Sequence, residues 1–130
     1  MTTELIYLTA TLILALVQVV APAAVKDLEF GLAWGVGARD HTPVSKNPVV
    51  GRLERAKANL YETLPLFIGA VLIAHVTGAE SALTLWGAAL YFWARVAYIP
   101  LYAFGVPYVR SLVWMVSLAG LILILVALFI

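Results

Sequence analysis

The sequence predicts an all-α fold, an integral membrane bundle of four antiparallel helices, and two observations lead to it. Hydrophobic residues make up 64% of the 130 residues and charged residues 12%, whereas soluble domains have roughly 45–50% and about 25%. The apolar residues also gather in four stretches, at about 5–25, 56–76, 81–102 and 109–130. Each stretch is close to the ~20 residues with which a helix crosses a bilayer. The length allows a single domain over residues 1–130.

The stretch at 5–25 is predicted to be a retained membrane-spanning helix. A cleaved signal peptide is the alternative, because Ala21-Pro22-Ala23 resembles a cleavage site. The leader before this stretch contains Glu4 and neither Lys nor Arg, and the apolar run is long for a signal. Both features favour the spanning helix.

The connections between the stretches predict the orientation in the membrane. The first connection, at about 26–54, is long and polar, whereas "TGAE" and "AFGVPY" make short second and third connections. In an antiparallel bundle the first and third connections lie on one side, and all basic residues then fall there: Lys26, Arg39, Lys46, Arg52, Arg55, Lys57, Arg95 and Arg110. The positive-inside rule therefore predicts a cytoplasmic long loop and both termini on the opposite side.

Charge and composition exclude several classes of function. The net charge is +1, so no basic field for nucleic acid is expected. Cysteine is absent, which excludes disulfides, thiolate metal sites and a protein thiol nucleophile. His41 and His75 lie far apart without the spacing of metal ligands, so no metal site is predicted.

The segment "RLERAKANLYETLPLF", at the start of the second helix, carries an unusual polar stripe. At about 100° per residue, Arg55, Asn59 and Glu62 share one face, and Glu62 lies roughly 10 Å along the axis from Arg55. An ionisable group at the centre of a span costs about 2.5–3.5 kcal/mol and persists mainly where it faces protein and has a partner. A structural explanation stays open: anchoring at the headgroups, an Arg55–Glu62 pair, or pairing across helices within the bundle.

A matching stripe is predicted on the third helix. Tyr91, Arg95, Tyr98 and Tyr102 follow spacings of a single helical face, while Arg110 and Ser111 open the fourth helix at the same depth. An aromatic belt with arginines at the membrane surface is the structural alternative. Arginines, an amide, a carboxylate and phenols that converge at one depth suit an anionic, peptide-like ligand.

These residues resemble a known family. "ERAKANLYETLPLF" is similar to the second-helix signature of MAPEG, the membrane-associated proteins of eicosanoid and glutathione metabolism, through Arg55, Ala56, Asn59, Glu62 and Pro65. "RVAYIPLY" and "GVPYVRS" also resemble the family's third and fourth helices, so the resemblance covers about 52–114. It is closest to the bacterial branch and to microsomal glutathione transferases.

The resemblance implies a homotrimer in the bacterial inner membrane, with periplasmic termini and with glutathione bound between subunits near the cytoplasmic side. The residues expected to bind glutathione are Arg55, Asn59, Glu62, Arg95, Tyr98 and Tyr102. Arg110 is the expected catalytic residue that stabilises the glutathione thiolate, with Ser111 beside it. The chain departs from characterised members at Lys57, where Gln or His is frequent, and at Ala58, where some members carry arginine.

The expected function is a glutathione-dependent transferase or peroxidase acting on hydrophobic electrophiles that partition into the bilayer. Its partners would be glutathione, the electrophile, membrane lipid and other copies of the chain. Two alternatives are a non-catalytic membrane protein that binds glutathione or a lipid headgroup at the same stripe, and a small four-helix transporter. Against the transporter, no carboxylate lies deep in the first span.

Overall fold

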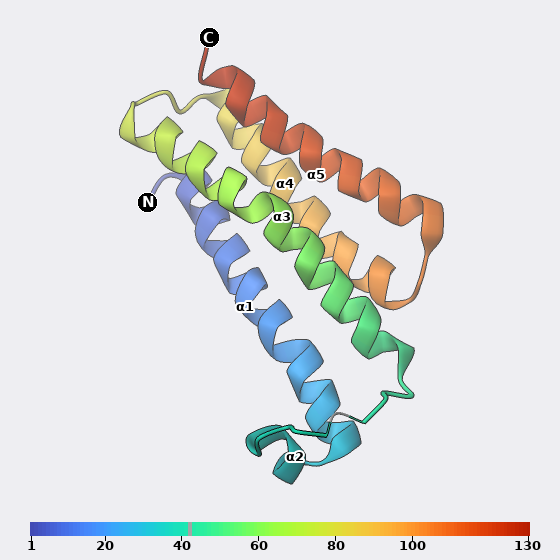
Figure 1. Cartoon of the computed structure of the whole chain (residues 1–130). Helices are drawn as coiled ribbons and strands as arrows, with labels where there is room; N and C mark the ends of the chain where they lie inside the picture. The colour runs from blue at the N-terminus through green and yellow to red at the C-terminus, as the bar shows by residue number, and fades with distance from the viewer. Residues whose placement is uncertain (42) are drawn as a thin grey trace.

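The computed structural model describes residues 1–41 and 43–130, and Thr42, inside the predicted loop 26–54, lies outside them. The described residues form helices and connecting turns (Figure 1). The helices are α1 (Thr3–Phe30), α2 (Leu32–Val36), α3 (Pro48–Val76), α4 (Ala82–Ala103) and α5 (Pro107–Ala127).

Four of these helices, α1, α3, α4 and α5, are long and apolar enough to cross a membrane. Their outer faces carry large apolar side chains that water would not favour, such as Leu16, 63% exposed, and Trp86, 64% exposed. An all-helical chain with four long apolar helices agrees with the predicted membrane four-helix bundle.

Local signals set the helix ends, so α1 and α3 are longer than the apolar stretches that they contain. Gly31 adopts φ 94° and its N–H donates to the Asp27 carbonyl, which ends α1. The Asn47 side chain accepts from the Val49 N–H at 3.0 Å, and Pro48 fills the first helical position of α3. Helical structure therefore extends at both ends into the region 26–54 that hydropathy assigned to a loop.

The core lies between α1, α3 and α4, with α5 packed mainly on α4. Phe67 stacks on Tyr91 with ring centroids 4.1 Å apart, and the Thr63 and Tyr91 hydroxyls form a hydrogen bond of 2.9 Å. Leu60, Leu121 and other buried apolar residues complete this cluster. The phenol of Tyr91 is thus buried with its hydroxyl satisfied, as a buried tyrosine requires, and it belongs to the core.

Small residues bring α4 and α5 into close contact. A Cβ placed on Gly87 would lie 2.6 Å from the carbonyl oxygen of Gly120, and a Cβ on Gly120 would lie 2.6 Å from that of Gly87. Reciprocal glycines of this kind let two membrane helices approach until their backbones touch. The α4–α5 pair is therefore a closely packed helical hairpin, and both helices line the groove described below.

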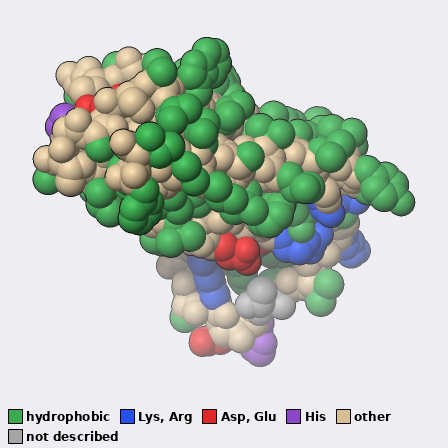
Figure 2. All heavy atoms as spheres, turned by 90° about the horizontal axis from the view of Figure 1, so that it is seen from above, with side chains coloured by type: hydrophobic (Ala, Val, Ile, Leu, Met, Phe, Trp, Pro, Cys, Tyr) green, Lys and Arg blue, Asp and Glu red, His purple; other side chains and the backbone are tan. Residues whose placement is uncertain are grey.

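The two ends of the bundle differ in charge. Both termini and the α3–α4 turn lie at one end, and α2 lies at the other (Figure 1). At the first end Thr2 donates a 2.6 Å hydrogen bond to Glu80, which lowers the pKa of that carboxyl below 4.5. Lys and Arg side chains gather on one part of the surface, while hydrophobic side chains cover much of the rest (Figure 2).

Candidate functional site

A groove of about 470 Å³ opens between α3, α4 and α5. It lies near the end where the chain turns from α4 into α5. Every predicted site residue except Arg95 lines it, and the full lining is Arg55, Ala58, Asn59, Glu62, Tyr98, Tyr102, Arg110, Ser111 and Trp114. The structure therefore brings together on three helices the side chains that the sequence placed on separate stripes.

Helical spacing explains how each element presents its residues. Asn59 and Glu62 lie three residues apart on α3, so they are neighbours on one face. Tyr98 and Tyr102 are one turn apart on α4 in the same way. Gly105, with φ 70°, shapes the turn after α4, and Pro107 then starts α5, whose first turn carries Arg110.

Tyr102 lies between two guanidinium groups. The Arg55 Nε donates to the Tyr102 hydroxyl at 3.2 Å, and the Arg110 guanidinium carbon lies 4.5 Å from the centroid of the Tyr102 ring. Tyr98 packs edge-on against Tyr102 with ring centroids 5.6 Å apart. The ring holds both cations along the groove wall by hydrogen bonding and cation–π attraction.

Glu62 is exposed in the groove. Among the ion pairs and hydrogen bonds of residues 1–41 and 43–130, none joins it to Arg55. The structural Arg55–Glu62 pair, left open by the sequence, is therefore not formed. The Arg55 Nε instead pairs across helices with the Tyr102 hydroxyl, while Arg55 and the exposed Glu62 carboxylate both line the groove.

Arg95 lies behind the groove wall and does not line the groove. Its side chain is 1% exposed, and its Nη1 donates to the Asn59 Oδ1 at 2.8 Å. Its guanidinium carbon lies 4.5 Å from the centroid of the Tyr98 ring. These contacts agree with the predicted position of Arg95 on the stripe face. Arg95 contacts the lining residues Asn59 and Tyr98, however, and is not itself exposed to the groove.

Trp114 was missed as a lining residue, although its spacing contained the signal. It lies four residues after Arg110 and three after Ser111, which places it on their face of α5. Ala58 was noted only as a departure from the family motif. It lines the groove with a small apolar side chain.

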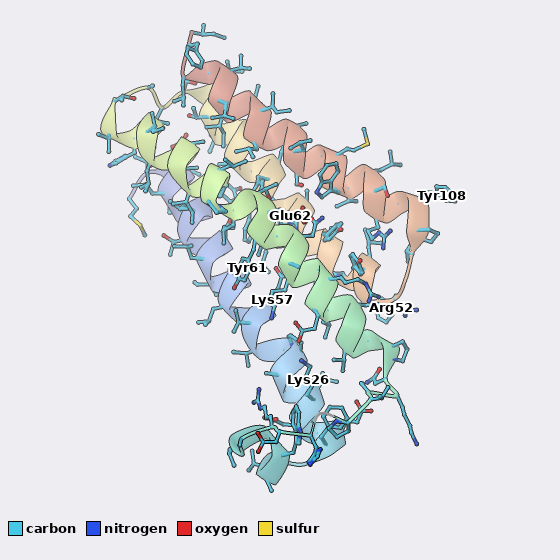
Figure 3. The ribbon with its side chains drawn as sticks, in the orientation of Figure 1. Lys26, Arg52, Lys57, Tyr61, Glu62 and Tyr108 are labelled. Atoms are coloured by element: carbon cyan, nitrogen blue, oxygen red, sulfur yellow. The ribbon has the colours of Figure 1, made fainter. Side chains whose placement is uncertain are left out.

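A second polar cavity, of about 200 Å³, lies on the other side of α3, against α1 and α2. Glu54 bridges two cations there, with Lys26 Nζ at 2.7 Å and Lys57 Nζ at 3.0 Å. Figure 3 shows Lys26 and Lys57 near each other between α1 and α3. Lys57 thus points away from the groove, as its position on the helix predicts.

The groove combines cations with a single carboxylate. Arg55 and Arg110 supply positive charge, Glu62 supplies negative charge, and Asn59, Ser111 and the phenols add neutral hydrogen-bonding groups. Guanidinium groups hold carboxylates, while a carboxylate holds an ammonium. The arrangement suits a flexible polar molecule that carries charges of both signs with an excess of negative charge.

Comparison with known proteins gives one result. The MAPEG family model matches residues 7–130, which is nearly the whole chain and includes every residue of the groove. No curated protein and no solved structure gives a significant match. Together with four helices long and apolar enough to span a bilayer, this match shows that the chain is an integral membrane protein and belongs to the MAPEG family.

Proposed function

We propose that this chain is a glutathione-dependent membrane transferase or peroxidase that conjugates or reduces hydrophobic electrophiles from the bilayer. The observation that carries the proposal is the groove between α3, α4 and α5, whose charged lining is open at the side of a lipid-facing bundle. Family membership is compatible with such a role. Within the family the chain is best assigned to a bacterial branch similar to microsomal glutathione transferases.

The lining fits the chemistry of glutathione. This tripeptide carries two carboxylates, one ammonium and two amides, so it presents both signs of charge with an excess of negative charge. Arg55 and Arg110 match the carboxylates or the thiolate, Glu62 matches the ammonium, and Asn59 matches an amide or carboxylate. The groove volume of about 470 Å³ falls within the range of about 300–1,000 Å³ usual for small-molecule sites.

The proposed reaction needs a thiolate near a cation. A neutral thiol attacks slowly, and burial disfavours its ionised form. Arg110 keeps its charge and lies in the first turn of α5, where the helix N-terminus also favours an anion. The thiolate attacks an electrophilic carbon of the acceptor, a carbon–sulfur bond forms, and the leaving group departs with the bonding electrons. Ser111 offers a hydroxyl donor beside the sulfur.

We also propose an orientation in the membrane and an assembly. We place the chain in the bacterial inner membrane as four antiparallel spans, with residues 26–54 cytoplasmic and the termini periplasmic. The clustering of basic residues around α2, the start of α3 and the start of α5 supports this orientation. A homotrimer would let a neighbouring copy close the open side of the groove, and we include it in the proposal.

A second candidate is non-catalytic binding of a lipid headgroup in the same groove. Arg55 is exposed at the polar end of α3, and Arg110 lies at the polar end of α5, where phosphate groups would be near. Arginine binds phosphate as readily as carboxylate. The electrophile assay below separates the two candidates, since a headgroup site would form no thioether.

The test is conjugation of glutathione by the protein purified in detergent, with a panel of apolar electrophiles and hydroperoxides. The expected result is thioether formation, or hydroperoxide reduction, above the uncatalysed rate. Arg55→Ala should raise the glutathione KM, because it removes a guanidinium that matches a glutathione carboxylate. Glutathione binding without turnover of any acceptor would favour the non-catalytic reading, and no glutathione binding would refute the proposal.

A further inference from the structure

The hydrogen bond between Arg95 and Asn59 determines which end of the Asn59 amide can meet a ligand. Arg95 Nη1 lies 2.8 Å from the Asn59 side-chain oxygen. A guanidinium has only donors, so the amide must turn its oxygen toward Arg95. The chemistry of the pair fixes the orientation of the amide, because the reverse orientation would bring two donors face to face.

The amide nitrogen of Asn59 is then left for the groove. Asn59 lines the groove and is half-buried. Within the part of the chain that the structure describes, its nitrogen forms no hydrogen bond, and it is not among the fully buried atoms without a partner. Two N–H donors therefore remain accessible from the open space.

We propose that Arg95 is a positioning residue, which holds Asn59 so that its amide donates to a carbonyl or carboxylate oxygen of the ligand. The inference rests on the proposed function in taking glutathione as that ligand. Glu62, one helical turn along α3, is an acceptor. Asn59 and Glu62 together would orient the ligand along α3, with a ligand oxygen at the Asn59 amide and the ligand ammonium at the Glu62 carboxylate.

The surroundings of Arg95 argue against a role in stability alone. The residue is 1% exposed, yet its Nε and Nη2 are buried without a partner among the described residues. One hydrogen bond and the face of the Tyr98 ring offset part of the cost of burying the charge. Burying a charge that lacks an ion-pair partner costs free energy, so an apolar side chain of similar volume in place of Arg95 removes that cost, and binding and stability should separate in a variant.

The first experiment measures glutathione affinity and thermal unfolding of the detergent-purified protein. Arg95→Met should weaken glutathione binding by about tenfold, no more than loss of the Asn59 amide itself, while the unfolding temperature of the ligand-free protein does not fall. The matched control is Gln18→Met, which also replaces a buried polar side chain with an unpartnered atom but lies on α1 outside the groove. The control should bind glutathione as the wild type does.

A double-mutant cycle tests the positioning role directly. Asn59→Ala should weaken binding about tenfold in the wild-type background and less than about twofold when combined with Arg95→Met, because the unheld amide no longer contributes. If Arg95→Met does not fold, Asn59→Asp is the second test variant. Its carboxylate still accepts the Arg95 hydrogen bond but offers no N–H to the groove. Wild-type affinity in Arg95→Met or Asn59→Asp, or full additivity in the cycle, would overturn the inference.

Side-chain nitrogen NMR gives a readout that does not depend on activity. The chain has two asparagines, Asn47 and Asn59, so asparagine-selective ¹⁵N labelling yields two side-chain NH₂ signals, assigned with Asn47→Ser. Arg95→Met should move the Asn59 signal in the ligand-free protein, and glutathione should move it in the wild type. A wild type that binds no glutathione would refute the proposed function. An Asn59 signal unmoved by Arg95→Met would refute the positioning role in either case.

Discussion

At the scale of single residues, a substitution at Glu62 tests whether its carboxylate binds the ligand or stabilises the fold. It lies exposed in the groove, and Arg55 pairs with Tyr102 and not with it. Glu62→Gln should therefore weaken glutathione binding by about 1–3 kcal/mol, the usual effect of losing a charged hydrogen-bond partner. Ligand-free stability should change little, because Glu62 forms no ion pair among residues 1–41 and 43–130.

Calorimetric titration with glutathione and thermal unfolding of the same sample would measure both quantities for Glu62→Gln. Glu80→Gln is a suitable control, since it neutralises a carboxylate at the opposite end of the bundle, where Thr2 is its partner. That control should leave the affinity for glutathione unchanged. Loss of stability with unchanged affinity in Glu62→Gln would show that the carboxylate serves the fold.

The position of Arg110 predicts that the thiol of bound glutathione ionises more readily than a free thiol. A free thiol of the cysteine type has a pKa of about 8.5, and lowering it by two units requires about 2.7 kcal/mol of differential stabilisation. Arg110→Ala should therefore abolish most of the ultraviolet thiolate absorbance of the glutathione complex at neutral pH. Affinity should fall less than in Arg55→Ala, because the thiolate is one of several charged groups on the ligand.

The control for the thiolate measurement is Arg39→Ala, which removes a cation packed on Trp34 outside the groove. It should leave the absorbance of the complex unchanged. If Arg110→Ala keeps both the thiolate signal and turnover, Arg110 contacts lipid phosphate and another group stabilises the sulfur.

Residue-level patterns predicted which side chains share a face but not how deep each one lies. The four- and three-residue spacings on α3 and α4 placed Arg55, Glu62 and Tyr102 correctly on faces that meet at one groove. They could not show that Arg95 is buried behind the wall, because its depth depends on where Asn59 and Tyr98 pack across the interface. Burial of a stripe residue is set by the neighbouring helix, which the periodicity of one helix does not contain.

At the scale of elements, the α4–α5 contact depends on glycine. A methyl group on Gly87 would meet the Gly120 carbonyl oxygen and the Ile124 side chain, both at 2.6 Å. Gly87→Ala should lower stability by about 1–3 kcal/mol, as overpacking of a tight contact does. Turnover should also fall, because α4 and α5 carry two walls of the groove.

Gly69 provides the matched control for this substitution on another membrane helix. A Cβ at Gly69 of α3 would meet nothing within 4 Å. Gly69→Ala should be neutral or stabilising by up to about 1 kcal/mol, because alanine has the higher helix propensity. Thermal unfolding of the two variants in one detergent makes the comparison, and equal stabilities would contradict the close α4–α5 approach.

Helix existence was predictable at this scale, and helix ends were less so. Four apolar stretches near bilayer length correspond to α1, α3, α4 and α5. Hydropathy could not show that α3 begins as early as Pro48, because that start depends on the Asn47 cap and on proline geometry. Polar residues such as Arg52 continue the helix beyond the apolar stretch at little cost, since the backbone remains hydrogen-bonded.

At the scale of the whole molecule, the orientation in the membrane can be tested with single cysteines, because the chain contains none of its own. Val44 and Ile130 are each 89% exposed, and the described residues between α2 and α3, 37–41 and 43–47, lie at the opposite end of the bundle from the C-terminus (Figure 1). In intact cells, Val44→Cys should resist a membrane-impermeant thiol reagent and Ile130→Cys should react, since the positive-inside rule places the basic end in the cytoplasm. Both variants should react equally after permeabilisation, which controls for their local accessibility. If Val44→Cys reacts and Ile130→Cys does not, the basic end faces outward, and the groove would lie on the side of the membrane away from cytoplasmic glutathione.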